Sequence, residues 1–444
     1  MTTKSRFGMV LPIILVSYFL ILLDNSVVFT STVKIAADLG MSKADVSWVT
    51  NIYALMFGSL LLLGGRLGDL YGRKVILIIG IIIFTLGSFL VGSSTSGTMI
   101  ILMRALQGIG SAILAPTTLA LLLDSYEGET RQKAISYYGV TAGIGASIGI
   151  IVGGLITTYV SWRWGFYINV PIGIGLIILA MIFIQKGRTR DAHLDYVGTL
   201  LSVVGLFLLV YSINGSSYRL PSFLISIGLL ALFVIIEKRK SNPLMPFKLF
   251  ADPERRWAYV ARFLFAGIAI AYFFLVPQTL QQVYGYTPLM SALAFMPETI
   301  PQFIFGLIQS KLSNRVSNNT LLLIGVSITV IGVILQFIIG LEHGYLIGVA
   351  IPMVIFGIGQ GLAFGPLTSA GVAHADDQIA GAASSAVNVF HQLGASVILS
   401  MVVALSSILA TPVAQYQHEF MILVVVGILT IIAAGLIKRA ANKD

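Results

Sequence analysis

The segment GRLGDLYGRKV, residues 65–75, separates two apolar runs at 44–64 and 74–94. Each run has the length of about 20 residues that a helix needs to cross the hydrocarbon core of a bilayer. Comparable runs, separated by short polar gaps, follow one another along all 444 residues. The sequence therefore predicts an all-α polytopic membrane protein.

The composition supports this class and excludes others. Hydrophobic residues make up 57% of the chain and charged residues 10%, against roughly 25% charged residues in an average soluble domain. A soluble fold could not cover so much apolar surface with polar groups. A soluble enzyme, a disordered protein and a nucleic-acid-binding factor are excluded. The net charge of +9 reflects membrane topology, because the basic residues gather in the short gaps.

The apolar runs predict fourteen spans and leave no room for an extramembrane domain. The longest gap, 238–256, is typical of a basic amphipathic stretch at the membrane surface. The N-terminal run also resembles a signal peptide, but it is too long and carries an acidic residue. The predicted spans are 9–33, 44–64, 74–94, 98–122, 133–157, 166–185, 196–214, 220–237, 257–281, 287–310, 320–340, 345–367, 380–410 and 418–437.

The basic residues also predict the orientation. If both termini lie on one side, 21 of the 27 Lys and Arg residues face that side and four face the other. Because Lys and Arg are enriched in cytoplasmic loops, both termini are expected in the cytoplasm. The other two, Arg104 and Arg262, fall inside spans. Arg262 is near the start of its span, where it is expected to anchor the helix at the interface.

Several chemistries are not expected. The chain has no cysteine, which excludes a thiol nucleophile and a thiolate metal site. No GxxxxGK[ST] segment and no HExxH segment occurs, and the five histidines are scattered. We therefore expect no enzymatic activity, no metal site and no bound cofactor.

Three charged residues lie well inside predicted spans: Asp24, Arg104 and Glu298. A charge at the centre of a bilayer costs at least about 2.5–3.5 kcal/mol, so such a group faces a cavity, finds a partner or takes up a proton. Glu298 lies between Pro297 and Pro301, which disrupt helical hydrogen bonds. The three residues are candidates for proton coupling. Two alternatives are that an acid–arginine pair, such as Asp24 with Arg104, only holds helices together, and that Arg104 extends to the interface.

The segment at 65–75 has its own chemistry. Its glycines are expected to allow a tight turn between close helices, Asp69 to accept hydrogen bonds from helix N-termini, and the basic residues to hold the segment in the cytoplasm. The residues concerned are Gly65, Arg66, Gly68, Asp69, Gly72 and Arg73.

A second glycine-rich segment, GIGASIGIIVGGLI at 143–156, places Gly145, Gly149 and Gly153 on one helix face, with Gly154 beside them. Such a face allows helices to approach closely. Plain helix packing and a gating hinge are equally compatible with it.

His391 is a further candidate, since histidine titrates near neutral pH and can relay protons. The alternative is a hydrogen-bonded packing histidine. Amphipathic residues inside spans are candidates for lining a substrate cavity, and aromatic faces there suit cationic drugs. The candidates are Asn25, Tyr53, Phe57, Gln107, Tyr137, Tyr138, Gln278, Phe303, Gln360 and Asn388.

These segments together resemble a known family. GRLGDLYGRKV at 65–75 is similar to the cytoplasmic loop signature of the major facilitator superfamily, and LMRALQGIGSA at 102–112 is similar to its helix 4 motif. GIGASIGIIVGGLI, SWRWGFYINVPIG at 161–173 and PQTLQQVYGYTPLMSALAFMPE at 277–298 resemble the fourteen-span drug:proton antiporters. Two positions depart from the pattern: Ile150 stands where a proline is usual, and His391 where arginine is more frequent.

The resemblance implies an architecture and roles for residues. Residues 1–190 would form one six-helix bundle, 191–256 two inserted helices with the linker, and 257–444 a second six-helix bundle. The segment at 65–75 would be a conformational latch, Arg104 would belong to proton coupling, and Asp24 would be the helix 1 acid.

The expected function is proton-coupled efflux of amphipathic, often cationic or zwitterionic drugs by alternating access. The partners are then drugs, protons and the lipid bilayer, with no nucleic acid, and the expected form is a monomer in a bacterial cytoplasmic membrane. The alternatives are a transporter dedicated to one cargo (a tetracycline–metal complex, a siderophore, a lipid or a metabolite), import by symport, and a membrane-embedded enzyme or scaffold.

Overall fold

The computed structural model describes residues 7–185, 195–214, 217–240, 243, 245–375 and 379–442, and all regular structure within these ranges is helical. This confirms the prediction of an all-α fold. By length and composition, thirteen of the described helices or broken helices can cross a membrane. They coincide with thirteen of the fourteen predicted spans. The other, 133–157, lies in a continuous helix, Gly128–Tyr159, where the side chains of 142–144 and 146 are outside the described set.

The chain divides into two compact units, Met1–Val203 and Val204–Asp444. The boundary falls inside α8, and the predicted division at 190 and 256 remains a prediction. The first unit contains α1 (Val10–Leu39), α2 (Lys43–Tyr71), α3 (Arg73–Gly92), α4 (Gly97–Ser125), α5 (Gly128–Tyr159), α6 (Trp162–Tyr167), α7 (Asn169–Phe183) and the start of α8 (Tyr196–Asn214).

The second unit contains the rest of α8 and the elements that follow it. One of its spans is divided into α11 and α12, and another begins with the short segment η3 before α14. Its elements are α9 (Arg219–Arg239), η1 (Phe247–Phe250), α10 (Pro253–Gln282), α11 (Pro288–Leu293), α12 (Met296–Leu312), α13 (Asn318–Ile339), η2 (Leu341–His343), η3 (Leu346–Ala350), α14 (Ile351–Gly371), α15 (Ala380–Ser406) and α16 (Pro412–Ala441).

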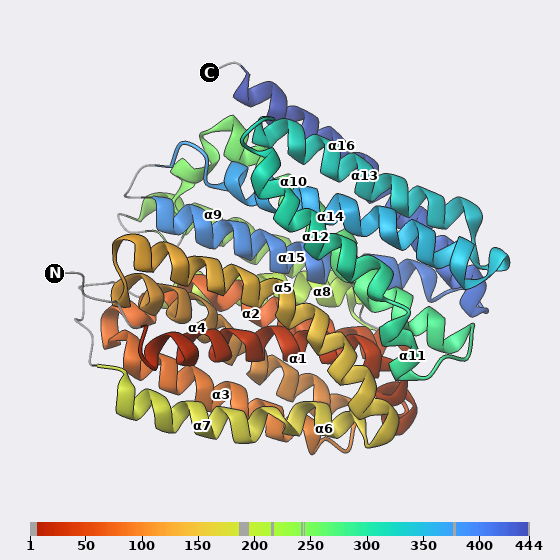
Figure 1. Ribbon diagram of the computed structural model, residues 1–444, viewed down its shortest axis with the longest axis horizontal. Helices are drawn as coiled ribbons and strands as arrows, with labels where there is room; N and C mark the ends of the chain where they lie inside the picture. The colour runs from red at the N-terminus through yellow and green to blue at the C-terminus, as the bar shows by residue number, and fades with distance from the viewer. Residues whose placement is uncertain are drawn as a thin grey trace. The chain divides into compact units, whose positions relative to one another are not determined.

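Helices of the first unit pack in pairs that small residues bring close together. α2 and α3 both lie along α4, and α1 lies along α5 (Figure 1). A Cβ added to Gly110 of α4 would stand 2.6 Å from the backbone nitrogen of Phe84 in α3. Such backbone approach is the usual basis of helix association in membranes.

The second unit is built in the same way. α13 lies against α14, α12 against α14, and α10 against both α15 and α16 (Figure 1). A Cβ on Gly357 of α14 would stand 2.2 Å from the carbonyl oxygen of Glu298 in α12. The backbone around Glu298 is therefore pressed directly onto α14.

The segment at 65–75 differs from its prediction. α2 continues to Tyr71, so Gly65 and Gly68 are helical, and the turn between α2 and α3 is made by Gly72 alone, with φ of +86°. The prediction that all three glycines form the turn was wrong. Gly65 and Gly68 instead lie 3.7 Å, measured from an added Cβ, from Pro116 and Thr117 of α4, so packing against α4 keeps this part of the sequence helical.

Candidate functional site

The first unit surrounds the Asp24 carboxylate with hydrogen-bond donors. Asp24 of α1 is 0% exposed, and its Oδ2 lies 2.5 Å from Nη1 of Arg104 in α4. Its Oδ1 accepts hydrogen bonds from Nε2 of Gln107 at 2.9 Å and from Nδ2 of Asn169 at 3.0 Å. A cationic partner and two amide donors together replace the hydrogen bonds that water would give to this carboxylate.

Arg104 is fixed from several sides. Its Nε donates to the carbonyl oxygen of Val49 at 3.0 Å, and its Nη1 donates also to Oε1 of Gln107 at 2.8 Å. The guanidinium lies 4.2 Å from the ring centre of Tyr53, a cation–π distance. Because Arg104 is itself 0% exposed, the alternative in which it extends to the interface was wrong. Its Nη2 has no hydrogen-bond partner among the described residues.

Sequence reasoning missed part of this cluster. Asn169 begins α7, and its Nδ2 also contacts Oγ of Ser88 in α3 at 2.9 Å. Ser88 donates in turn to the carbonyl oxygen of Phe166 at 2.9 Å, and the Tyr53 hydroxyl is 2.7 Å from Oγ of Ser111. The available signal was a buried polar residue within an apolar run, but only tertiary structure brings these helices together.

Glu298 in the second unit has the opposite environment. It is 0% exposed in the first turn of α12, and neither of its carboxylate oxygens has a hydrogen-bond partner among the described residues. The span predicted over 287–310 is interrupted between α11, which ends at Leu293, and α12, which starts at Met296. Pro297 thus lies in the first turn of α12, and Pro301 lies inside that helix.

The second unit also contains a buried acid that sequence reasoning missed. Glu419 is 0% exposed and accepts a hydrogen bond from Oγ of Ser406 at 2.9 Å. The predicted span at 418–437 left Glu419 at its edge, where an acid is unremarkable. Because α16 begins at Pro412, Glu419 is about two turns inside the helix.

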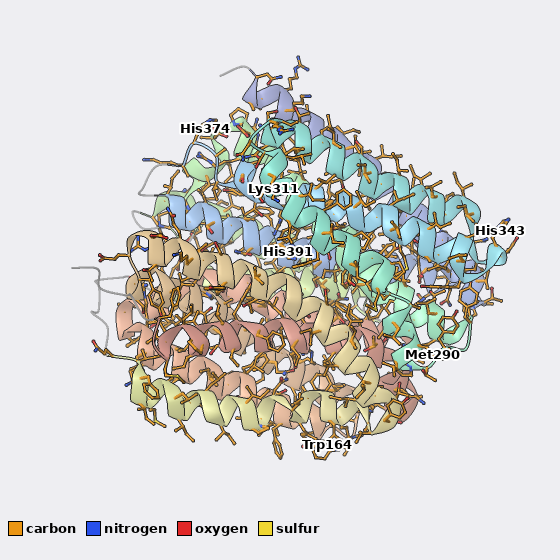
Figure 2. The ribbon with its side chains drawn as sticks, viewed as in Figure 1. Trp164, Met290, Lys311, His343, His374 and His391 are labelled. Atoms are coloured by element: carbon orange, nitrogen blue, oxygen red, sulfur yellow. The ribbon has the colours of Figure 1, made fainter. Side chains whose placement is uncertain are left out.

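His391 lies on α15, labelled in Figure 2, beside an aromatic and a cationic side chain. The centre of its ring is 5.9 Å from the centre of the Phe364 ring. The Arg262 guanidinium lies 4.1 Å from the centre of the same Phe364 ring. Arg262 is 3% exposed and donates to Oγ1 of Thr368 at 3.3 Å. His391 Nδ1 is buried without a hydrogen-bond partner among the described residues. Arg262 is thus packed inside its unit.

The segment at the α2–α3 turn is tied to α4 by charge. Arg73 Nη1 lies 2.5 Å from Oδ2 of Asp124 and also donates to the carbonyl oxygen of Ala120. Arg73 Nη2 is 3.5 Å from Oδ1 of Asp69. Asp69 is therefore bound to a side chain of α3, where the sequence suggested a helix N-terminus. Arg66 lies on α2, in the same segment.

The predicted glycine face of α5 packs on α1. A Cβ on Gly149 would stand 2.6 Å from the Ser26 Cβ, and a Cβ on Gly153 would stand 2.7 Å from the Cα of Val27. A Cβ on Gly145 would likewise stand 3.0 Å from the Cβ of Leu22. Gly154 is buried next to this face. The glycines thus set the position of the helix that carries Asp24.

The cavity candidates in the first unit are divided. Tyr53 and Gln107 belong to the Asp24 cluster, and Phe57 lies edge-on to Tyr53 at 6.0 Å. Tyr138 stacks on Tyr18 at 4.0 Å. Two others stand apart, since Tyr137 is 50% exposed and Asn25 is only partly buried.

The candidates in the second unit are divided too. Gln360 and Gln278 are buried, and amide atoms of both lack hydrogen-bond partners among the described residues. Phe303 and Asn388 are exposed on the surface of the unit. No group of three or more His, Asp or Glu residues that could hold a metal ion occurs within the described ranges.

Comparisons with known proteins agree with this architecture. The family model described as Major Facilitator Superfamily matches residues 14–399. The cephamycin export protein CmcT of Amycolatopsis lactamdurans is 34% identical over 85% of this chain and 80% of its own length. The puromycin resistance protein pur8 of Streptomyces alboniger is 34% identical over 86% and 78%. The multidrug transporter protein MdtP of Bacillus subtilis is 29% identical over 90% and 75%.

Solved structures share the fold at low sequence identity. A bacterial homologue of the human lysosomal transporter Spinster, inward-facing and unoccupied, aligns with a TM-score of 0.70 at 15% identity, covering 99% of this chain and 98% of its own. An auto-inhibited peptide transporter of the POT family aligns with a TM-score of 0.72 at 13% identity, covering 98% and 97%.

Proposed function

This chain belongs to the major facilitator superfamily, and we propose that it is a proton-coupled exporter of amphipathic drugs. It is a multi-pass membrane transporter and not an enzyme. The observation that carries the proposal is the contrast between two fully buried acids, Asp24 in the first unit and Glu298 in the second, which have opposite surroundings. One acid is paired with arginine, and the other has no hydrogen-bond donor among the described residues.

Glu298 is the proton carrier in this proposal. An ionised carboxylate buried without a donor is costly, so the geometry described here suits the protonated acid. When alternating access opens the site to water, hydration stabilises the carboxylate and the proton is released. A carboxyl whose two protonation states favour different conformations couples proton movement to the conformational cycle.

Asp24 supplies negative charge beside aromatic rings. Arg104 neutralises it in the present arrangement, and Tyr53 and Phe57 provide apolar faces next to the pair. A cationic drug that approaches this cluster competes with Arg104 for Asp24, so drug binding and rearrangement of Arg104 are linked. Proton coupling at Asp24 then depends on where Arg104 lies.

The segment from Gly65 to Arg73 acts as a latch in this proposal. Arg73 joins the α2–α3 turn to Asp124 at the end of α4, the helix that also carries Arg104. A rearrangement at the turn can therefore reach the Asp24 cluster along a single helix, α4. We place this turn, and both termini, in the cytoplasm of a bacterium, and we expect the transporter to act as a monomer.

A second candidate function is export of one dedicated antibiotic. Two relatives at 34% identity are named for a single antibiotic each, cephamycin and puromycin, whereas MdtP is named as a multidrug transporter. The two candidates share the same buried acids and differ in the breadth of the substrate list.

The test is expression in a bacterium that lacks its own pumps, with the Asp24→Asn and Glu298→Gln variants and the control Glu342→Gln. Glu342 is an exposed acid of η2 in the second unit. We expect the wild type and the control to give resistance to several unrelated cationic dyes and antibiotics, and both variants to lose it. Resistance to a single compound would favour the dedicated exporter. Full resistance from both variants would contradict the proposed mechanism.

A further inference from the structure

We propose that Asp38, Trp162 and Arg163 are positioning residues that close the Asp24 cluster at one end of the first unit, the end at which α1 finishes. This role rests on the proposed alternating access, in which the cluster must be sealed from one medium while it faces the other. With both termini placed in the cytoplasm, the closed end faces the outer medium. The observation behind it is that one helical span holds α1 at two separate points.

The first point of contact is at the end of α1. Nε1 of Trp162 and Nη1 of Arg163, both at the start of α6, donate to the same oxygen, Oδ2 of Asp38, at 2.8 Å and 3.0 Å. Nη2 of Arg163 donates to the carbonyl oxygen of Ser94, between α3 and α4, at 3.1 Å. The Arg163 guanidinium also lies 4.4 Å from the centre of the Trp162 ring. These four residues form the outer clasp.

The second point of contact is the Asp24 cluster itself. α6 and α7 together make one span, Trp162–Phe183, so Asn169 follows Trp162 by about two turns. Nδ2 of Asn169 donates to Oδ1 of Asp24 at 3.0 Å. Asp24 and Asp38 are about 21 Å apart along α1, at 1.5 Å per residue. The span that carries Asn169 is therefore fixed to α1 both at the outer clasp and at Asp24.

An apolar plug fills the space between these two points. Trp162 and Phe166 are 2% and 0% exposed, and their rings meet edge to face with 6.1 Å between the centres. Phe166 extends the plug to the cluster, since its ring centre is 5.8 Å from the Arg104 guanidinium. The other members of the plug are Val28, Ile35, Val49, Val91 and Ile100. An apolar constriction of this kind keeps out water, and a channel gate can work in the same way.

The outer clasp is far more accessible than the plug that it holds. The side chains of Asp38 and Arg163 are 48% and 31% exposed. Ion pairs in such positions contribute little, because water competes for both charges. Weak polar contacts at the rim therefore hold a dry plug in place. A gate that opens and closes in every cycle needs this combination, because a strongly bonded closed state would not open.

The test uses a thiol as a reporter of access to the plug. The chain has no cysteine, so a single introduced thiol reacts alone. Val28 lies one turn from Asp24 on α1, deeper than the outer clasp, and is 0% exposed. Labelling of Val28→Cys by a membrane-impermeant maleimide is followed from each side of lipid vesicles, with no drug present. The variants added to this parent are Asp38→Ala, Asp38→Glu and the control Lys34→Gln, at an exposed position one turn earlier on α1.

We expect slow labelling of the parent from the outer side. Asp38→Ala should accelerate labelling from that side about tenfold, which corresponds to roughly 1.4 kcal/mol of closed-state stability, and should leave labelling from the other side unchanged. Asp38→Glu keeps an acceptor for both donors and should restore slow labelling, and Lys34→Gln should match the parent. Labelling of Asp38→Ala at the parent's rate would overturn the inference. Equal acceleration from both sides would also overturn it, since that result indicates general loosening of the unit.

A second variant tests whether the contacts of the outer clasp work together. Arg163→Met keeps an unbranched side chain over Trp162 and removes the bonds to Asp38 and Ser94. We expect faster labelling of Val28→Cys from the outer side. The effect should shrink when Asp38→Ala is also present, because one of the two bonds is then already lost. The same acceleration by Arg163→Met in both backgrounds would overturn the proposed role of the Asp38 contact.

Ethidium transport separates this inference from the proposed function. Accelerated outer labelling in Asp38→Ala, together with a wild type that moves no ethidium under an imposed pH gradient, would contradict drug export and support the outer clasp. A wild type that accumulates ethidium, together with unchanged labelling in Asp38→Ala, would overturn the outer clasp and leave the proposed function standing.

Discussion

Asp24 and Glu298 are both fully buried acids on helices that can span a membrane, but one is surrounded by donors and the other is not. Asp24 receives an arginine and two amides, from α4 and α7. The side-chain oxygens of Glu298 receive no hydrogen bond from the described residues, although α14 packs directly against the Glu298 backbone. A protein can thus bury a carboxyl by satisfying its charge or by removing that charge with a proton. The two acids are therefore suited to different tasks.

The largest expected effect comes from removing the charge of Asp24. Asp24→Asn leaves Arg104 buried with no counter-charge, and breaking a buried pair in this way costs about 3–5 kcal/mol. We expect a correspondingly lower unfolding free energy in detergent, measured by denaturant titration of the purified protein. Removing both charges in Asp24→Asn/Arg104→Gln should recover part of the loss. A single variant as stable as the wild type would show that the pair is not desolvated.

Asn169 offers a smaller change to the same cluster. Asn169→Ala removes one donor from the ionised carboxylate, and hydrogen bonds to charged groups contribute about 1.5–3 kcal/mol. We expect the loss to disappear when Asp24→Asn is also present, because the donor then has no charge to stabilise. A double-mutant cycle of unfolding free energies measures this coupling. Strictly additive effects would contradict the direct bond.

The glycine face of α5 tests whether the Asp24 cluster depends on the position of α1. Gly149→Leu would force α1 away, and overpacking of this kind costs about 1–3 kcal/mol. Gly139 of the same helix has open space around it, so Gly139→Leu is the matched control. We expect Gly149→Leu to lower both the melting temperature and transport, and the control to change neither. Equal melting temperatures and equal transport in the two variants would show that the glycine face does not set the position of α1.

The smallest effect on stability is expected at Glu298. If this acid is protonated in the folded state, Glu298→Gln exchanges one neutral group for another of the same shape, with a change of less than about 1 kcal/mol in unfolding free energy. Measurement under the same conditions as Asp24→Asn gives the direct contrast between the two acids. A loss as large as that of Asp24→Asn would mean that Glu298 is ionised and paired.

The sequence was informative wherever one residue was enough to identify a constraint. An acid or arginine within an apolar run is conspicuous, so Asp24, Arg104 and Glu298 were identified, and the pairing of Asp24 with Arg104 was one of the alternatives. The donor Asn169 was missed because its role depends on α1, α3 and α7 meeting in three dimensions.

Two other differences have local causes. Glu419 was assigned to a span edge because hydropathy locates a helix only by its apolar part, whereas α16 begins six residues earlier, at Pro412. Gly65 and Gly68 were interpreted as turn residues because glycine permits turns. Packing against Pro116 and Thr117 of α4 keeps them helical, and that tertiary effect is invisible in a short segment.

The account's central claim is that Glu298 carries the proton that drives export. The most direct test is ethidium transport in proteoliposomes containing Glu298→Gln, measured once down a dye gradient and once against it under an imposed pH gradient, beside the wild type and Glu342→Gln. We predict that Glu298→Gln still lets dye equilibrate but no longer accumulates it, while the control does both. Accumulation by Glu298→Gln at the wild-type rate would contradict the claim.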